Sequence, residues 1–168
     1  MTGELLITKA IQTSKAPQPG LYSQAIRVDC GTHSKLIMSG QTGNIPDGKE
    51  EPVFLGGVGP QTTQTLENIL AVVQEAGGSI ANILKLEIFL RDPAKSFMDA
   101  LHNGIERKSQ RLKFNKAYED FFKSHGITKT EGILPARVMV WVPEVPLEKP
   151  TEETEIEINP VEVIISKS

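Results

Sequence analysis

The order of hydrophobic segments along the chain predicts an α/β (α+β) fold built from one mixed sheet and two helices. The chain has 168 residues, a length that suits a single domain. Short apolar runs with alternation predict strands, and two longer stretches have helical periodicity. In chain order they form the pattern β-β-β-α-β-α-β-β. Two helices are too few to cover both faces of a sheet of about six strands, so we expect both on one face.

The predicted strands are rich in Val, Ile and Leu and end at turn-forming residues. They cover residues 4–8, 22–28, 36–39, 83–90, 137–142 and 155–165. In the run 83–90, alternation places the even-numbered residues on the core side and the odd-numbered ones, Phe89 among them, on the other. Pro160 cannot donate a hydrogen bond to a neighbouring strand, so we expect a bulge or an edge position there.

Residues 60–76 have the clearest helical pattern. Leu66, Ile69, Leu70 and Val73 recur at the spacing of one helical face. Pro60 is tolerated at the first position of a helix, and the two glycines at 77 and 78 supply the stop.

The second helical region runs from about residue 97 to 125. Its best-defined part contains Phe114, Tyr118, Phe121 and Phe122 and ends before Gly126. We interpret the polar, basic stretch near 103–113 as a surface insertion and the proline- and acid-rich stretch near 143–154 as a long loop. The expectation is therefore one domain over residues 1–168 that carries both additions.

Composition excludes several classes of protein. The formal net charge is −3, which argues against nucleic-acid binding even for the basic run 106–113. No run of eighteen apolar residues and no secretory signal is present, and the single Cys30 cannot form an intrachain disulfide. We therefore expect a reducing compartment, the cytoplasm or the mitochondrion. The histidines, the cysteine and the acids have no metal-ligand spacing, so no metal is expected.

Arg137 is the most informative side chain, because it places a permanent cation at the mouth of the strand 137–142. Its partner is either a structural carboxylate or the carboxylate or phosphate of a small ligand. Arg137 shares parity with Met139 and Trp141, so we expect all three, with Phe89, on the sheet face away from the helices. A half-apolar face of that size is rarely left in water. We therefore expect it to be buried by self-association, with a pocket between subunits.

Six segments in register give the chain a family resemblance. They are Ala16–Ile26, Ser39–Gln41, Gln61–Leu70 with Glu75–Gly77, Phe114–Phe122, Pro135–Arg137 and Glu155–Glu157. In these segments the chain resembles the RidA (YjgF) family of reactive-imine deaminases, whose members are also called L-PSP endoribonucleases. The resemblance implies a chorismate-mutase-like fold and a homotrimer with clefts between subunits. It also implies hydrolysis of 2-iminopropanoate or 2-iminobutanoate to the 2-oxo acid and ammonia, with no cofactor.

The resemblance also assigns roles to residues. Arg137 would grip the substrate carboxylate with its planar fork, and Glu155 would position water and move protons. Glu157, two residues on, remains an alternative for the second role. The expected substrate-binding residues are Tyr22, Ser39, Gly40 and Asn115.

Two other functions remain open at this point. The first is a non-catalytic, metabolite-binding or chaperone-like trimer that binds a 2-oxo acid in the same cleft. The second is an RNA-cleaving protein that uses the basic run 106–113.

Overall fold

The computed structural model describes residues 8–46, 56–93, 104–145 and 154–166. The predicted strand 4–8, apart from its last residue, lies outside them. So do the first part of the second helical region and most of the long loop near 143–154.

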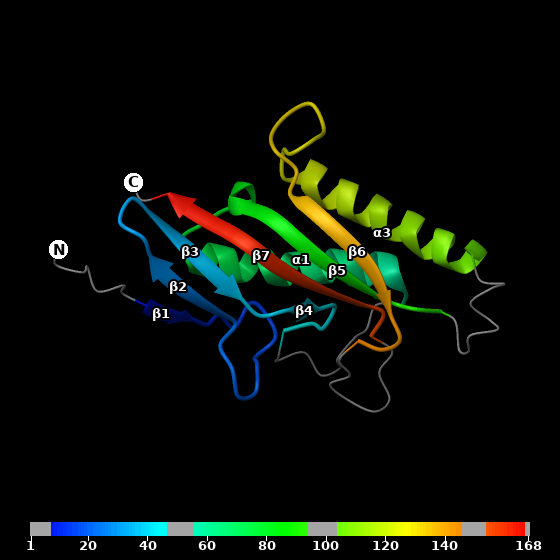
Figure 1. Ribbon diagram of the computed structural model, residues 1–168, viewed down its shortest axis with the longest axis horizontal. Coiled ribbons are helices and arrows are strands. Elements are labelled where there is room, and N and C mark those ends of the chain that lie inside the picture. Colours follow the sequence, from blue (N-terminus) through cyan, green and yellow to red (C-terminus); the bar gives the residue numbers. More distant parts are fainter. Residues whose placement is uncertain (1–7, 47–55, 94–103, 146–153, 167–168) are drawn as a thin grey trace.

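One mixed sheet of seven strands forms the main layer (Figure 1). Its strands follow the order β1-β2-β3-β7-β5-β6, and the short β4 also pairs with β7. β5 and β6 are parallel and the other pairs are antiparallel. The strands are β1 (Thr8–Ile11), β2 (Ala25–Asp29), β3 (His33–Met38), β4 (Gln41–Thr42), β5 (Ile83–Arg91), β6 (Ala136–Val142) and β7 (Ile156–Ser166). The predicted mixed sheet is confirmed, and β4 is the strand that the alternation pattern misses.

β7 is the central strand, and its proline is accommodated in two ways. On one side β7 pairs with β4 at residues 157–158 and with β3 at residues 163–166, so Pro160 falls between these two partners. On the other side the register with β5 shifts next to Pro160, which is opposite Leu86. The bulge predicted from the proline is confirmed.

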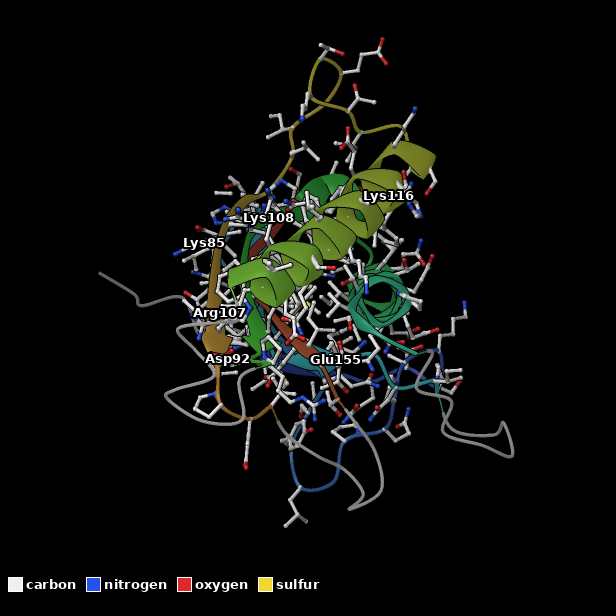
Figure 2. All side chains as sticks on the ribbon, turned by 90° about the vertical axis from the view of Figure 1, so that its right-hand side faces the viewer. Lys85, Asp92, Arg107, Lys108, Lys116 and Glu155 are labelled. Atoms are coloured by element: carbon white, nitrogen blue, oxygen red, sulfur yellow. The ribbon has the colours of Figure 1, made fainter. Side chains whose placement is uncertain are left out.

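Two helices cover one face of the sheet, as predicted. They are α1 (Val58–Glu75) and α3 (Gly104–Ser124), and a 3-10 turn, η1 (Ile80–Asn82), leads into β5. The side view shows both helices on the same side of the strands (Figure 2). Residues 104–113, interpreted above as an insertion, form the first half of α3 and are mostly exposed.

The core lies between the helices and the sheet. Phe114 and Phe122 of α3 are fully buried, as are Leu66 and Ile69 of α1. The Tyr118 ring links the two phenylalanines, with centroid distances of 5.7 Å to Phe114 and 4.6 Å to Phe122. Burying a side chain of this size contributes about 1.5–3 kcal/mol, so this cluster holds α3 on the sheet.

The prediction that Arg137, Met139 and Trp141 lie on the face away from the helices is wrong. Arg137 pairs with the fully buried Leu86, and paired residues of neighbouring strands point to the same side. Val138, which points the other way, is 47% exposed. Both faces of β6 carry apolar residues, so alternation alone has no basis for choosing the inner one.

Direct contacts with α3 support this correction. The Trp141 indole Nε1–H donates to Gln110 Oε1 at 3.3 Å, and Met139 and Trp141 pack against the core. Nearby, Arg107 of α3 forms an ion pair with Asp92, just beyond the end of β5 (Figure 2). The helix α3 is thus attached to β6 through Trp141 and to the end of β5 through Asp92.

The alternation predicted for β5 holds over most of the strand. Leu86, Ile88 and Leu90 are fully buried, and Phe89 lies on the opposite face. The exceptions are Ile83, which is buried, and Leu84, which is 37% exposed, because the register with β7 shifts on either side of residue 85. The irregularity breaks the period of two, and Leu84 turns outward.

The sheet face opposite the helices carries exposed apolar side chains, namely Ile26, Ile37, Val138 and Val140. They come from β2, β3 and β6 and therefore extend across the sheet. Such a face is typical of an interaction surface.

Candidate active site

Arg137 is held in place by α3 without being neutralised by it. Its Nη2–H donates to Asn115 Oδ1 at 2.8 Å. The guanidinium carbon lies 4.5 Å from the centroid of the Tyr118 ring and 5.2 Å from that of Phe114. Among the described residues no carboxylate pairs with Arg137. The remaining N–H groups of the guanidinium are therefore available to an anion.

Arg137 opens onto a cavity of about 550 Å³ between the end of α3 and the loop that precedes β6. Its lining also contains Lys123 and Lys129, against one acid, Glu119. Burial raises the pKa of Tyr118 to about 12, so its phenol stays protonated at neutral pH. We call this cavity the arginine pocket. It is lined by Asn115, Tyr118, Glu119, Lys123, Ile127, Thr128, Lys129, Thr130, Leu134, Pro135 and Arg137.

Tyr22, Ser39 and Gly40 come together in a second cavity, of about 750 Å³, on the open face of the sheet. The Ser39 hydroxyl donates its proton to Ser23 O at 2.8 Å, which leaves the hydroxyl oxygen as an acceptor. Glu157 belongs to the same lining. We call this cavity the glutamate pocket. It is lined by Tyr22, Val28, Cys30, Lys35, Ile37, Met38, Ser39, Gly40, Glu87, Glu157, Asn159, Pro160 and Val161.

Gly40 is needed because two side chains occupy the space where a Cβ would be. A methyl group at this position would overlap Oε1 of Glu157 and Oδ1 of Asn159. The glycine therefore lets these polar groups lie directly against the main chain.

The two candidate carboxylates lie in different environments. Glu157 is partly buried in the glutamate pocket, and this burial raises the pKa of its carboxyl group. Glu155 lies just before β7 (Figure 2), where its backbone N–H donates to Gln61 Oε1 at 2.8 Å. None of the four cavities described for the chain includes Glu155 in its lining. The geometry therefore favours Glu157 over Glu155 as the carboxylate of the site.

Tyr22 lies in the segment before β2, because that strand begins at Ala25. The predicted start of the strand at residue 22 is therefore wrong. Tyr22 is 57% exposed and also borders a small cavity of about 80 Å³ next to Gly40 and Glu157. Sequence reasoning misses the residue that holds this segment, Gln24. Its buried amide accepts from Thr13 N at 2.6 Å and donates to Pro17 O at 2.8 Å. The Pro-rich turn is thus fixed from inside.

The sheet separates the arginine pocket from the glutamate pocket, and the two share no lining residue. Arg137 is paired with the buried Leu86, on the helix side. Glu157 lies between the buried Ile156 and Ile158 of β7, so it points to the open side. β5 lies between β6 and β7, which puts the two strands about 9–10 Å apart. One chain therefore presents two half-sites that face different ways.

The described residues contain no group of three or more His, Cys, Asp or Glu side chains placed to hold a metal ion. In the same part of the chain, no helix is long and apolar enough to cross a membrane.

Comparisons with known proteins place the chain in a family. A family model described as Endoribonuclease L-PSP matches residues 13–162. A RutC family protein of Aquifex aeolicus is 36% identical over 151 residues, which cover 89% of this chain and 96% of the relative. The 2-iminobutanoate/2-iminopropanoate deaminase of Salmonella typhimurium is 32% identical over 158 residues, covering 94% and 98%.

Solved structures agree with the sequence relatives. The YjgF gene product of E. coli has a TM-score of 0.64 at 28% identity, covering 95% of this chain and 99% of that one. E. coli TdcF with bound serine has a TM-score of 0.63 at 29% identity, with the same coverage. The predicted resemblance is confirmed, and the chain belongs to the endoribonuclease L-PSP family, which includes the YjgF (RidA) proteins.

Proposed function

We propose that this protein is a hydrolytic deaminase of small 2-imino acids such as 2-iminopropanoate and 2-iminobutanoate. In this reaction R–C(=NH)–COO⁻ and water give R–C(=O)–COO⁻ and ammonia. The observation that carries the proposal is Arg137, an oriented guanidinium without a carboxylate partner among the described residues, which opens onto a cavity. Relatives named 2-iminobutanoate/2-iminopropanoate deaminase support the choice of reaction.

Arg137 supplies the anchor for the substrate carboxylate. Asn115 accepts from one nitrogen of the guanidinium, and the Tyr118 ring lies against its plane. The other N–H groups form a fork that matches a carboxylate in a bidentate arrangement. Each charge-assisted hydrogen bond of this kind contributes about 1.5–3 kcal/mol. The anchor therefore fixes where the imine carbon lies.

Glu157 is the group that moves protons. Its carboxylate removes one proton from water as the water oxygen attacks the imine carbon, and passes that proton to the nitrogen to give a carbinolamine. It then moves the remaining hydroxyl proton to the same nitrogen, so that the C=O bond forms, the C–N bond breaks and ammonia leaves. Burial raises the pKa of this carboxyl group towards the working pH, which suits a group that must both take and give a proton. General acid–base catalysis of this kind contributes about 10²–10⁴-fold to the rate.

The complete site is formed between subunits of a homotrimer, with Arg137 from one chain and Glu157 from the next. Two features of the single chain support this part of the proposal. First, the two half-sites lie on opposite sides of the sheet. Second, the open face carries exposed apolar residues, with Ile37 in the lining of the glutamate pocket and Val138 across the sheet on β6. In the trimer the exposed apolar face is buried between subunits, and this burial stabilises the assembly.

Mixing two inactive variants tests both the activity and the shared site. The readout is ammonia release from 2-iminopropanoate generated in the cuvette by a pyridoxal-phosphate enzyme. Arg137→Ala and Glu157→Gln are each expected to lose activity. When the two are refolded together in equal amounts, about a quarter of the interfaces combine an intact arginine with an intact glutamate, so about a quarter of the wild-type activity returns.

Three results would contradict the proposal. No acceleration by the wild-type protein removes the deaminase activity, and saturable 2-oxo acid binding without turnover would instead indicate a metabolite-binding trimer. If the mixed sample recovers no activity, Arg137 and Glu157 act within one chain, which contradicts a site shared between subunits. Tight RNA binding that weakens steeply with salt would favour the exposed basic residues of α3 as a nucleic-acid surface.

A further inference from the structure

Asn159 is the polar neighbour of Glu157 that the mechanism above leaves unused. The two residues are two positions apart on β7, so their side chains lie on the same face. Asn159 pairs with Glu87 of β5 and Glu157 pairs with Phe89. Asn159 lines the glutamate pocket and also an adjoining cavity of about 160 Å³, and Glu157 contributes to both. Any ligand that reaches the carboxyl group of Glu157 therefore also comes close to this amide.

The oxygen atoms of the two side chains converge on one point. Oε1 of Glu157 and Oδ1 of Asn159 would each overlap a methyl group placed on Gly40. Both atoms are therefore within one small volume above the Gly40 main chain. When Glu157 is ionised, both are acceptors and neither can donate to the other. When the carboxyl group is protonated, it becomes a donor with an acceptor beside it.

The amide oxygen of Asn159 has no other use in the described part of the chain. It is buried, and it has no hydrogen-bond partner there. Buried polar atoms without a partner are rare in folded proteins, and each one calls for a reason. An acceptor that is left empty next to an ionisable group is satisfied when that group takes up a proton.

We propose that Asn159 is a positioning residue whose Oδ1 accepts a hydrogen bond from the Glu157 carboxyl group while that group holds the proton taken from water. The inference rests on the proposed deaminase function and deepens its proton-transfer step. Water gives one proton to Glu157 and its oxygen forms the new bond to the imine carbon. Asn159 holds the resulting O–H until the proton moves to the amino nitrogen. Glu157 then carries the hydroxyl proton of the adduct to the same nitrogen, the C=O bond forms as the C–N bond breaks, and the products are the 2-oxo acid and ammonia.

Other charged and titratable groups face Glu157 from the neighbouring elements, and the test must leave them in place. They are Tyr22 before β2, Cys30 after β2, Lys35 on β3, Glu87 on β5 and Glu144 after β6. Substitutions at Asn159 change none of them, so a change in the titration of Glu157 is attributable to the amide.

The experiment measures how kcat/KM for 2-iminopropanoate depends on pH in the wild type, in Asn159→Ala and in Asn159→Ser. The acidic limb of this profile reports the essential carboxylate of the free enzyme. Loss of an acceptor for the protonated form lowers the pKa of Glu157, so the limb moves to lower pH by about 0.5–1 unit. In Asn159→Asp a second negative charge moves the limb to higher pH. Asn82→Ala is the matched control, because that amide donates to Ile164 O of the same strand but lines neither cavity.

The sign of the shift decides the outcome. A limb that moves to higher pH in Asn159→Ala would mean that the amide donates an N–H to ionised Glu157, which overturns the inference. An unmoved limb in both Asn159→Ala and Asn159→Ser would reduce Asn159 to a packing neighbour of Gly40 and also overturns it. Carbon-13 NMR of the Glu157 carboxyl group measures the same pKa without turnover. The inference therefore fails separately from the proposed function, which fails if the wild type does not hydrolyse the imine.

Discussion

Replacing Arg137 gives the most direct test of the site, because the structure separates what the side chain does for folding from what it does for a ligand. In the folded chain Arg137 makes one hydrogen bond to Asn115 and contacts two rings, with the guanidinium exposed. Exposed contacts of this kind contribute about 0.5–1 kcal/mol each. We expect Arg137→Ala to lower the free energy of unfolding by about 1.5–3 kcal/mol and to remain folded.

The effect on catalysis is expected to be larger. A substrate carboxylate bound by two charge-assisted hydrogen bonds loses about 3–6 kcal/mol when the fork is removed, which lowers kcat/KM about 10²–10⁴-fold. Arg137→Lys keeps the charge but not the fork, so an intermediate loss of about tenfold is expected. The assay is ammonia release from enzymatically generated 2-iminopropanoate, with urea denaturation in parallel.

Lys116→Ala is the control for this series, since Lys116 is a cation on α3 next to Asn115, pairs with Asp120 and is outside the arginine pocket. Its kcat/KM should equal that of the wild type. If Arg137→Ala kept kcat/KM within about twofold of the wild type, or if the control lost as much, the assignment of Arg137 as the carboxylate anchor would be refuted.

Three further predictions follow from the geometry. Gly40→Ala should fold but lose about 10²-fold or more in kcat, because the new methyl group displaces the oxygens of Glu157 and Asn159; wild-type activity would contradict the overlap. Glu157→Gln should unfold at a higher temperature than the wild type at pH 7, since it removes a charge whose burial raises the carboxyl pKa. The difference should disappear below about pH 4, where both forms are neutral, and calorimetry at several pH values checks the sign. Phe122→Ala should cost about 3–5 kcal/mol in urea denaturation, because the side chain is fully buried in the hydrophobic core; a loss under about 1 kcal/mol would contradict that burial.

The helices and most strands are predictable from local patterns. α1 begins at Val58, two residues before the predicted start, and ends at Glu75 next to the two glycines. β5 and β6 begin within one residue of their predicted positions. β4 has only two residues, too few to show alternation, and it exists because β7 offers it a pairing edge.

The candidate site is less accessible from sequence. Tyr22, Ser39 and Gly40 share a cavity, and Arg137 and Asn115 share another, as the family resemblance implies. Asn159 is absent from the sequence-based set because a lone asparagine in a strand has no distinguishing pattern. Its proximity to Gly40 depends on how β7 lies beside the segment that joins β3 to β4.

Periodicity and turn residues determine the element order, the side on which most β5 residues lie and the position of the proline bulge, because each of these depends on neighbours close in the chain. The tertiary structure decides which face of β6 meets α3 and which of the two alternating acids, Glu155 or Glu157, enters a cavity. Those outcomes depend on the register between strands that are distant in sequence, and a change of one residue in register exchanges the two faces. The separation of Arg137 from Glu157 by the sheet likewise arises only when β5 is placed between their strands.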